Sequence, residues 1–299
     1  MSLRIENAID MHCHFGPDTV GGVAQPVLID GELVKNRHSV TGYEAAKEAF
    51  ESGHKAIVLK SHSFCSCQLA ANLQQVVPGL KVFGGACTDH ASGGLSVASV
   101  DAALTLGARI VWLPTINSCQ DMSGRMAPRF PGLKGIPVTD DSGEPNQIVR
   151  DIFDLVRQRD AVLATGHVSA ADHYAVIKAF AREGKVLVTH AGEEMAGPKL
   201  TAAQAKELAD LGAMIELTAQ CCVQVFGHPP KSAKAMAEMI QTIGYDRCTL
   251  SSDYGWSVAV PKPAEGLKDF LEKLWDVGVP EAELNRMVSA NPARLLSIN

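Results

Sequence analysis

The chain has 299 residues, 46% of them hydrophobic and 20% charged, which is enough apolar material for a large core and excludes a disordered protein. The net charge is -6 and Lys and Arg form no long run, which argues against a nucleic-acid or anionic-membrane partner. There is no apolar region typical of a signal peptide, no run of the ~20 apolar residues that span a membrane, and the eight cysteines are scattered, so we expect a cytoplasmic, reduced protein.

Short apolar runs rich in β-branched residues recur along the chain and predict eight strands. In chain order they span Asn7–His14, Ala56–His62, Lys81–Cys87, Arg109–Thr115, Ala161–His167, Lys185–His190, Ala213–Ala219 and Arg247–Asp253.

Segments of helical period lie between these runs. They span Thr41–Ser52, Cys67–Val77, Val97–Leu106, Asn146–Arg159, Ala170–Arg182, Thr201–Leu211, Lys231–Ile243 and Ala264–Val277. Thr201 is suited to cap its helix, and Gly107 marks the end of another.

Strands that alternate with helices imply a parallel sheet, and eight such units favour a closed (β/α)8 TIM barrel in a single domain over residues 1–299. An open doubly wound sheet is the alternative, but no GxGxxG turn follows the first strand. Long intervals after the first and fourth strands, Phe15–Val40 and Ile116–Pro145, are predicted to form loops at the C-terminal mouth of the barrel and to cover substrate. Surface insertions without function are the other interpretation.

Histidines and one aspartate fall where the predicted strands end. Side-chain alternation along the first strand would place Asp10, His12 and His14 on one face, directed into the barrel, and leave Ile9, Met11 and Cys13 against the helices. The HxH pair then offers two imidazoles to one cation.

Three later strands end in the same way. His167 ends the fifth strand, His190 the sixth and Asp253 the eighth, so all three are expected at the C-terminal rim. Imidazole and carboxylate ligands suit a divalent transition metal, with zinc favoured and manganese, iron or nickel as alternatives. Such a metal makes water a usable nucleophile near neutral pH, and Asp253 is the expected general base.

Other polar residues of these segments have weaker claims. Lys60 and His62, in the second strand, are candidates for substrate binding, and Glu216 in the seventh strand would need a cationic partner if it faces inward. Arg125 and Arg129 in the loop after the fourth strand could hold a carboxylate or phosphate, although exposed loop arginines usually have no such role.

These residues resemble the metal-ligand pattern of the amidohydrolase superfamily, through the HxH pair, the two later histidines and Asp253. The segment NPARLL at residues 291–296 is similar to the helix that closes those barrels. The resemblance implies that His12 and His14 hold the more buried metal position. It also implies that His167 and His190 hold a second metal or contact substrate, and that Asp253 is both a metal ligand and the catalytic base and acid.

The sequence departs from that pattern in one place. The fourth strand, RIVWLPT, has neither the lysine nor the glutamate that bridges two metals in binuclear members, so one or two ions remain open, with Lys60 as a substitute bridge. The chain is thus expected to belong to an uncharacterised branch of the superfamily, in which dimers and higher oligomers are common.

The expected function is hydrolysis of an amide, lactone or ester bond of a small molecule. A metal-dependent lyase such as a decarboxylase is the first alternative, because the superfamily includes both. A Schiff-base aldolase using Lys60 is the second, and a non-catalytic metal-binding protein is the third.

Overall fold

The computed structural model describes residues 3–18, 27–29, 32–34, 38–224 and 227–298. Eight parallel strands form one sheet in the order β1-β4-β5-β6-β7-β8-β9-β10. The strands are β1 (Ile9–His14), β4 (Ala56–Lys60), β5 (Lys81–Cys87), β6 (Ile110–Trp112), β7 (Val162–Ala164), β8 (Lys185–Val188), β9 (Met214–Thr218) and β10 (Cys248–Ser251). All eight were predicted.

Two backbone hydrogen bonds join the first and last strands and close the barrel. The amide of His14 donates to the carbonyl of Tyr254 (2.8 Å), and the amide of Asp253 donates to the carbonyl of His12 (2.9 Å). Gly255 is required beside this seam, because a Cβ atom there would lie 1.8 Å from the carbonyl oxygen of His14. The predicted (β/α)8 barrel is therefore confirmed.

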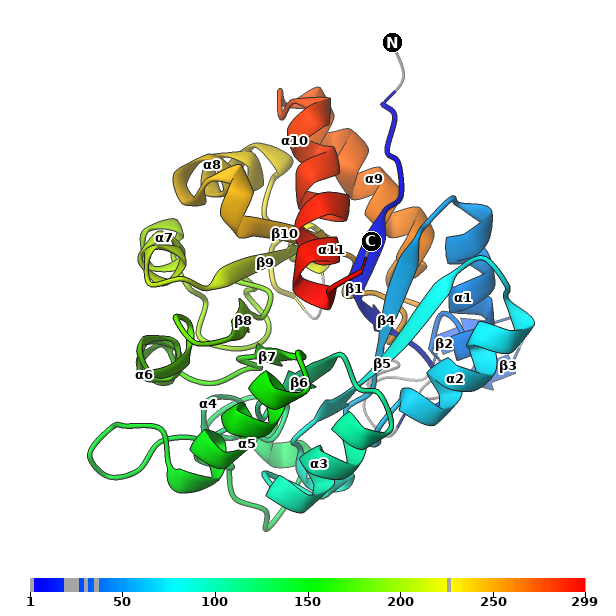
Figure 1. Cartoon of the computed structure of the whole chain (residues 1–299). Coiled ribbons are helices and arrows are strands. Elements are labelled where there is room, and N and C mark those ends of the chain that lie inside the picture. The colour runs from blue at the N-terminus through cyan, green and yellow to red at the C-terminus, as the bar shows by residue number, and fades with distance from the viewer. Residues whose placement is uncertain (1–2, 19–26, 30–31, 35–37, 225–226, 299) are drawn as a thin grey trace.

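Eight helices alternate with the strands and surround them (Figure 1). They are α1 (Gly42–Glu51), α2 (Cys67–Val76), α3 (Val97–Thr105), α5 (Gln147–Gln158), α6 (Ala170–Phe180), α7 (Ala202–Asp210), α8 (Ala233–Ile243) and α9 (Pro263–Asp276). Thr201 caps α7 as predicted. The buried face of α5 consists of Val149, Ile152, Phe153 and Val156, the spacing of one helical stripe.

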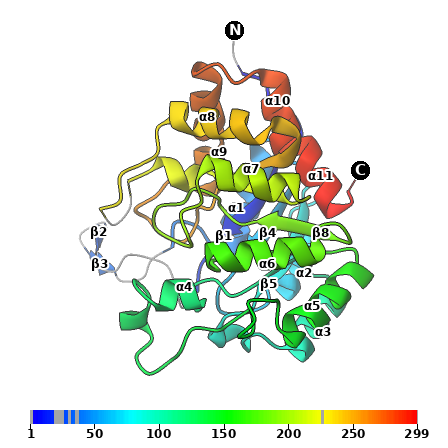
Figure 2. The same ribbon diagram turned by 90° about the vertical axis from the view of Figure 1, so that its left-hand side faces the viewer.

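Shorter elements occupy the two ends of the barrel. The loop after β1 contains a hairpin of β2 (Val27–Ile29) and β3 (Glu32–Val34), and the loop after β6 contains α4 (Cys119–Met122) and a 3-10 turn at Ala127–Arg129. Figure 2 shows β2, β3 and α4 on one side of the molecule and α11 (Asn291–Leu296) on the opposite side. Helix α10 (Glu281–Asn285) and a π-helical turn at Arg286–Ala290 lead into α11. The described parts of the two long loops thus lie at the mouth, as predicted, whereas residues 19–26, 30–31 and 35–37 of the first loop lie outside the described residues.

The barrel interior near α11 is apolar. Ile9 and Met11 pack there with Trp112 and with Leu295 and Leu296 of α11. The predicted alternation of β1 is therefore wrong for these residues, since Ile9 and Met11 lie inside and only Cys13 packs under α1. The reason is a bulge: the register with β4 slips by one residue between Asp10 and Cys13, which changes the face that each side chain occupies.

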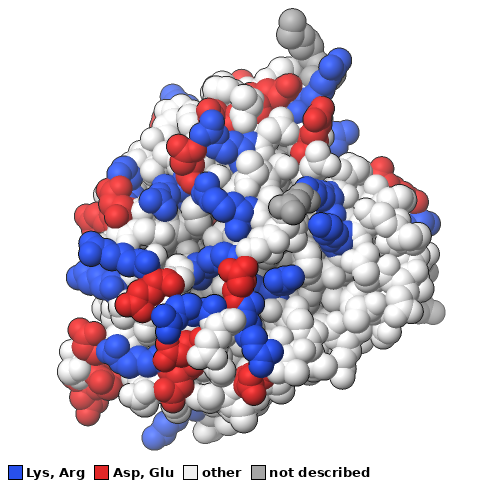
Figure 3. All heavy atoms as spheres, viewed as in Figure 1, with Lys and Arg blue, Asp and Glu red and all other residues white. Residues whose placement is uncertain are grey.

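The charged surface is mixed. On the face shown in Figure 3, basic and acidic side chains are interspersed and form no extended patch of one sign. Among the described residues, no helix combines the length and the apolar character needed to cross a membrane.

Candidate metal centre

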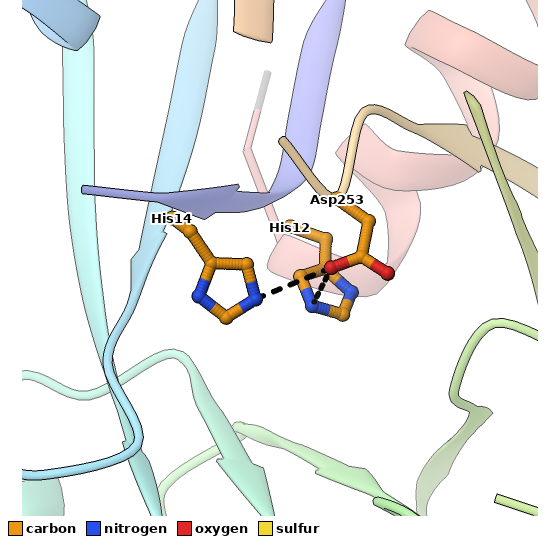
Figure 4. Close-up of side chains that lie close together, drawn as sticks. All are labelled: His12, His14 and Asp253. Carbon is orange, nitrogen blue, oxygen red and sulfur yellow. Dashed lines mark ion pairs between the residues drawn. The ribbon is translucent and has the colours of Figure 1, made fainter. Parts of the chain in front are cut away.

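His12, His14 and Asp253 meet at the seam that closes the barrel. The Nε2 atom of His12 lies 3.0 Å from Asp253 Oδ1, and Nε2 of His14 lies 3.2 Å from the same oxygen (Figure 4). All three side chains are buried and form one group with the spacing of a metal site. The same two strand ends that exchange the closing hydrogen bonds therefore supply all three side chains.

Asp253 reaches this position through an unusual backbone conformation. The residue follows β10 and has a φ of 58°, in the left-handed region that non-glycine residues seldom occupy. His190, which follows β8, also has a positive φ of 28°. Such conformations are often found at functional sites. Here they occur at two site residues that lie two positions after the ends of their strands.

Glu216 of β9 contacts the imidazole of His12 on its Nδ1 side. The Nδ1 atom of His12 donates to Glu216 Oε2 at 3.0 Å, and the backbone amide of His190 donates to the same oxygen at 3.2 Å. Glu216 is fully buried, so the inward orientation considered from the sequence is the one observed. A carboxylate on Nδ1 fixes the imidazole so that its Nε2 lone pair faces the cluster, as is usual for histidines that bind metals.

Lys60 of β4 also contacts His12. Its Nζ atom is 2.9 Å from His12 Nε2 and 5.5 Å from the centre of the Trp112 ring, and the side chain is buried. Among the described residues, His12 is thus contacted on one nitrogen by Glu216 and on the other by both Lys60 and Asp253.

The charges of the cluster are tightly coupled. Burial lowers the pKa of His12, but the nearby Asp253 and Glu216 carboxylates outweigh burial and Lys60 and raise it to about 9. Burial lowers the pKa of His14 to about 4. Burial raises the pKa of Asp253, but His12 and His14 outweigh it and hold that pKa well below its usual range. The carboxyl groups of Asp253 and Glu216 therefore favour a positive charge on His12.

His167 and His190 lie beside this cluster, not within it. Their rings are 4.7 Å apart between centroids, and the His190 ring is 5.8 Å from that of His12. Nδ1 of His167 contacts Asp121 Oδ2 at 2.8 Å, so its Nε2 is left for another partner. Gly166 before it has a φ of 64°, and a Cβ there would lie 2.2 Å from the Leu113 carbonyl oxygen.

His62 belongs to a second buried group. Its ring stacks on that of His14 at 5.0 Å, and its Nδ1 lies 2.7 Å from the Thr115 hydroxyl and 3.4 Å from Asp89 Oδ2. His62, Cys87 and Asp89 are near enough to share an ion. The sequence reasoning did not select Asp89 or Asp121. Asp89 lies two residues after the end of β5, so the search for polar residues at strand ends could have found it. Asp121 lies in the loop after β6, where no sequence pattern marks it.

A pocket opens above these side chains at the mouth. Its polar lining includes His14, Lys60, His62, His167, His190 and Asp253, and its wall includes Ile116, Met195, Ala196 and Trp256. Arg125, Arg129 and Glu193 complete the lining. The pocket therefore joins six of the predicted metal-site and substrate residues to both arginines of the loop after β6, while Glu216 and His12 are not part of its lining.

Several solved enzyme structures share this fold over nearly the whole chain, at low sequence identity. A probable dipeptidase from Pseudomonas aeruginosa has a TM-score of 0.65 at 11% identity, over 98% of this chain and 95% of that chain. A probable 2-pyrone-4,6-dicarboxylic acid hydrolase from Acinetobacter baumannii, with citric acid bound, has a TM-score of 0.59 at 11% identity, over 98% and 100%. A 2,6-dihydroxybenzoate decarboxylase from Rhizobium has a TM-score of 0.55 at 11% identity, over 98% and 99%.

The sequence of this chain matches a protein family but no curated protein. Residues 7–216, which include the HxH pair, Lys60, His62, His167, His190 and Glu216, match a protein family described as a family of unknown function, DUF6282. The chain therefore belongs to the DUF6282 family and has an amidohydrolase-like (β/α)8 barrel.

Proposed function

We propose that this protein is a metal-dependent hydrolase that cleaves an amide, lactone or ester bond of a small molecule. The observation that carries the proposal is the convergence of His12 Nε2 and His14 Nε2 on one oxygen, Asp253 Oδ1, at 3.0 Å and 3.2 Å. The similarity to solved amidohydrolase-fold structures, which include hydrolases and dipeptidases, supports it.

The donor set fits a divalent transition metal. When His12 donates Nδ1–H to Glu216, its Nε2 presents a lone pair to a carboxylate oxygen only 3.0 Å away. Two electron-pair donors at that distance need a proton or a cation between them, and a second imidazole approaches the same oxygen. Nitrogen and oxygen ligands favour zinc, with manganese, iron and nickel as alternatives.

His12, His14 and Asp253 would hold the metal, with the imidazoles of His62 and His190 next to them, 5.0 Å from the His14 ring and 5.8 Å from the His12 ring. His167 and His190 would then bind a second ion or contact substrate. The Lys60 ammonium beside His12 favours a single ion, because a second cation there would be repelled. N-carboxylation of Lys60 would reverse that preference.

A bound metal would supply Lewis acidity, which activates water and polarises the bond to be cleaved. Asp253 would take the proton of the attacking water and return it to the leaving group, since its carboxylate contacts both imidazoles of the metal group and also lines the pocket. His62, fixed at Nδ1 by Thr115, would direct Nε2 toward substrate in the pocket. Trp256, Met195 and Ile116 would limit the access of bulk water.

A metal-dependent decarboxylase is the second candidate, favoured by two cationic groups of the pocket wall, Arg125 and Arg129, and by the decarboxylases among the similar folds. Product analysis separates the reactions, because release of carbon dioxide without incorporation of water identifies the lyase. A Schiff-base aldolase remains a third candidate because Lys60 is buried and lines the pocket. Borohydride trapping with a carbonyl substrate would label Lys60 only in that case.

The test is metal content by elemental mass spectrometry on purified protein reconstituted with zinc or manganese. We expect one or two equivalents in the wild type and a loss of at least one equivalent in His12→Ala and Asp253→Asn. Asp246→Asn is the matched control, because Asp246 is an exposed aspartate bound to Arg286 away from the pocket. An absence of metal from every reconstituted wild-type sample would contradict the proposal and favour chemistry at Lys60.

A further inference from the structure

Arg125 and Arg129 add two cationic side chains to the pocket that the metal-binding side chains line. Both line the pocket, although they are distant in sequence from its histidines. The charged lining residues are Lys60, Arg125 and Arg129 against Glu193 and Asp253, so the protein side chains sum to +1 before any metal is added. The chain as a whole has a net charge of -6. The pocket therefore differs in sign from the rest of the molecule.

The segment that carries these arginines has a small core of its own. Ile116, Met122 and Met126 are buried together, and Phe130 packs against them. Met126, which is buried, and Phe130, which is partly buried, each directly follow one of the two arginines in sequence, so their packing holds the backbone from which Arg125 and Arg129 extend. This distinguishes the pair from loop arginines that are free in solvent.

Arg125 is also tied to the candidate metal centre. Its NH2 atom lies 2.7 Å from Asp121 Oδ2, the oxygen that contacts Nδ1 of His167 at 2.8 Å. The other oxygen of Asp121 accepts the Gly197 amide at 3.1 Å. Asp121 is thus fully engaged, and it places one guanidinium at a fixed position beside His167.

Arg129 has no ion pair with any of the described residues, and it is exposed at the pocket wall. A guanidinium offers a planar fork of N–H donors that matches the oxygens of carboxylate and phosphate groups. An anionic substrate group would supply the counter-charge that the described protein residues do not provide to Arg129.

We infer that the substrate of this pocket is a small molecule with an oxyanion group, a carboxylate or phosphate, bound by Arg129 with Arg125 as the second contact. The inference rests on the proposed function, because it assigns to the metal centre the cleavage of another part of the same molecule. The apolar lining residues Ile116, Met195 and Trp256 would contact the body of the substrate.

Isothermal titration calorimetry with three probes tests the inference: succinate, inorganic phosphate and succinamide, which is the uncharged analogue of succinate. On metal-loaded wild-type protein we expect succinate or phosphate to bind at least about tenfold more tightly than succinamide. Arg129→Gln should weaken anion binding by about 10- to 100-fold, the usual effect of losing a charge-assisted contact. Arg129→Lys should recover part of the loss, because charge returns without the fork.

Arg157→Gln is the matched control, since Arg157 is a half-exposed arginine of α5 that pairs with Asp154 outside the pocket, and it should leave binding unchanged. The stronger of the two anions identifies the oxyanion. The same titrations on metal-stripped protein separate this inference from the proposed function, because dependence on Arg129 should persist there even if no preparation binds metal. Equal binding of both anions to wild type, Arg129→Gln and Arg125→Gln, or no preference over succinamide, would overturn the inference.

Discussion

The two ends of this barrel are built from the same eight strands but differ in almost every property of their interior. At the end covered by α11, Ile9, Met11 and Trp112 pack with Leu295 and Leu296 in an apolar cluster. At the mouth, the interior consists of imidazoles, carboxylates and a lysine. A barrel can bury so many polar groups at one end only because the other end supplies stability through ordinary packing.

The border between the two regions runs through β1. Met11 belongs to the apolar cluster, and the next residue, His12, already belongs to the polar one. Strict alternation would not place neighbouring residues inside the same barrel, and the bulge in β1 is what allows it. Trp112 forms the floor between the regions, with its ring centre 6.0 Å from the His12 ring and its indole Nε1 unpaired among the described residues. We therefore expect changes at the closed end to alter stability and changes at the mouth to alter ligand binding.

Leu296→Ala should have the largest effect and should act on stability alone. The side chain is fully buried in the closing helix, so its truncation should lower the free energy of unfolding by about 2–5 kcal/mol. Chemical denaturation followed by circular dichroism measures the change. Leu106→Ala is the control, because Leu106 is 51% exposed and should lose less than about 1 kcal/mol. A loss of metal in folded Leu296→Ala would show that the two ends are not independent.

His54 offers a pH-dependent test of the closed end. Burial lowers the pKa of this histidine from 6.5 to about 4, and its Nδ1 has no partner among the described residues. The unfolded chain therefore binds the proton more readily, so this contribution to stability is complete above pH 6.5 and is lost as the pH falls toward 4.

Between pH 8 and pH 5, wild type should lose about 2 kcal/mol more stability than His54→Gln, as measured by urea denaturation of metal-free samples. Metal-free samples are used so that the release of a ligand does not add to the difference. Parallel pH profiles for the two proteins would show that His54 is not protected from protonation by burial.

The fold was predictable from the sequence because each strand carries an apolar run and each helix a stripe of apolar residues, and both patterns are local. The strand ends were less accurate, because His62, His167, His190 and Asp253 lie just beyond the hydrogen-bonded strands. At His190 and Asp253 the backbone has a positive φ, a conformation that cannot be predicted from these residue types.

The site was predictable only in part. His12, His14 and Asp253 were expected near one another and are so in the structure. The bulge in β1 was not predictable, because it depends on the register with β4 and not on the sequence of β1 alone. Asp121, which positions both His167 and Arg125, lies in an irregular loop whose path is set by tertiary contacts.

Glu216→Gln is the smallest and most selective change at the mouth. Glutamine keeps a carbonyl oxygen that can accept from His12 Nδ1 and from the His190 amide, but it removes the negative charge beside the imidazole. The basicity of His12 toward a metal should fall, and metal affinity should drop by about tenfold, the lower end of the range for such supporting contacts. Competition with a chromogenic chelator measures the affinity. Glu238→Gln is the control, because Glu238 is an exposed residue of α8. An unchanged affinity would mean that packing around His12, and not the charge of Glu216, sets the geometry of the metal centre. Glu216 would then belong with the closed end, whose residues act on stability, and not with the mouth.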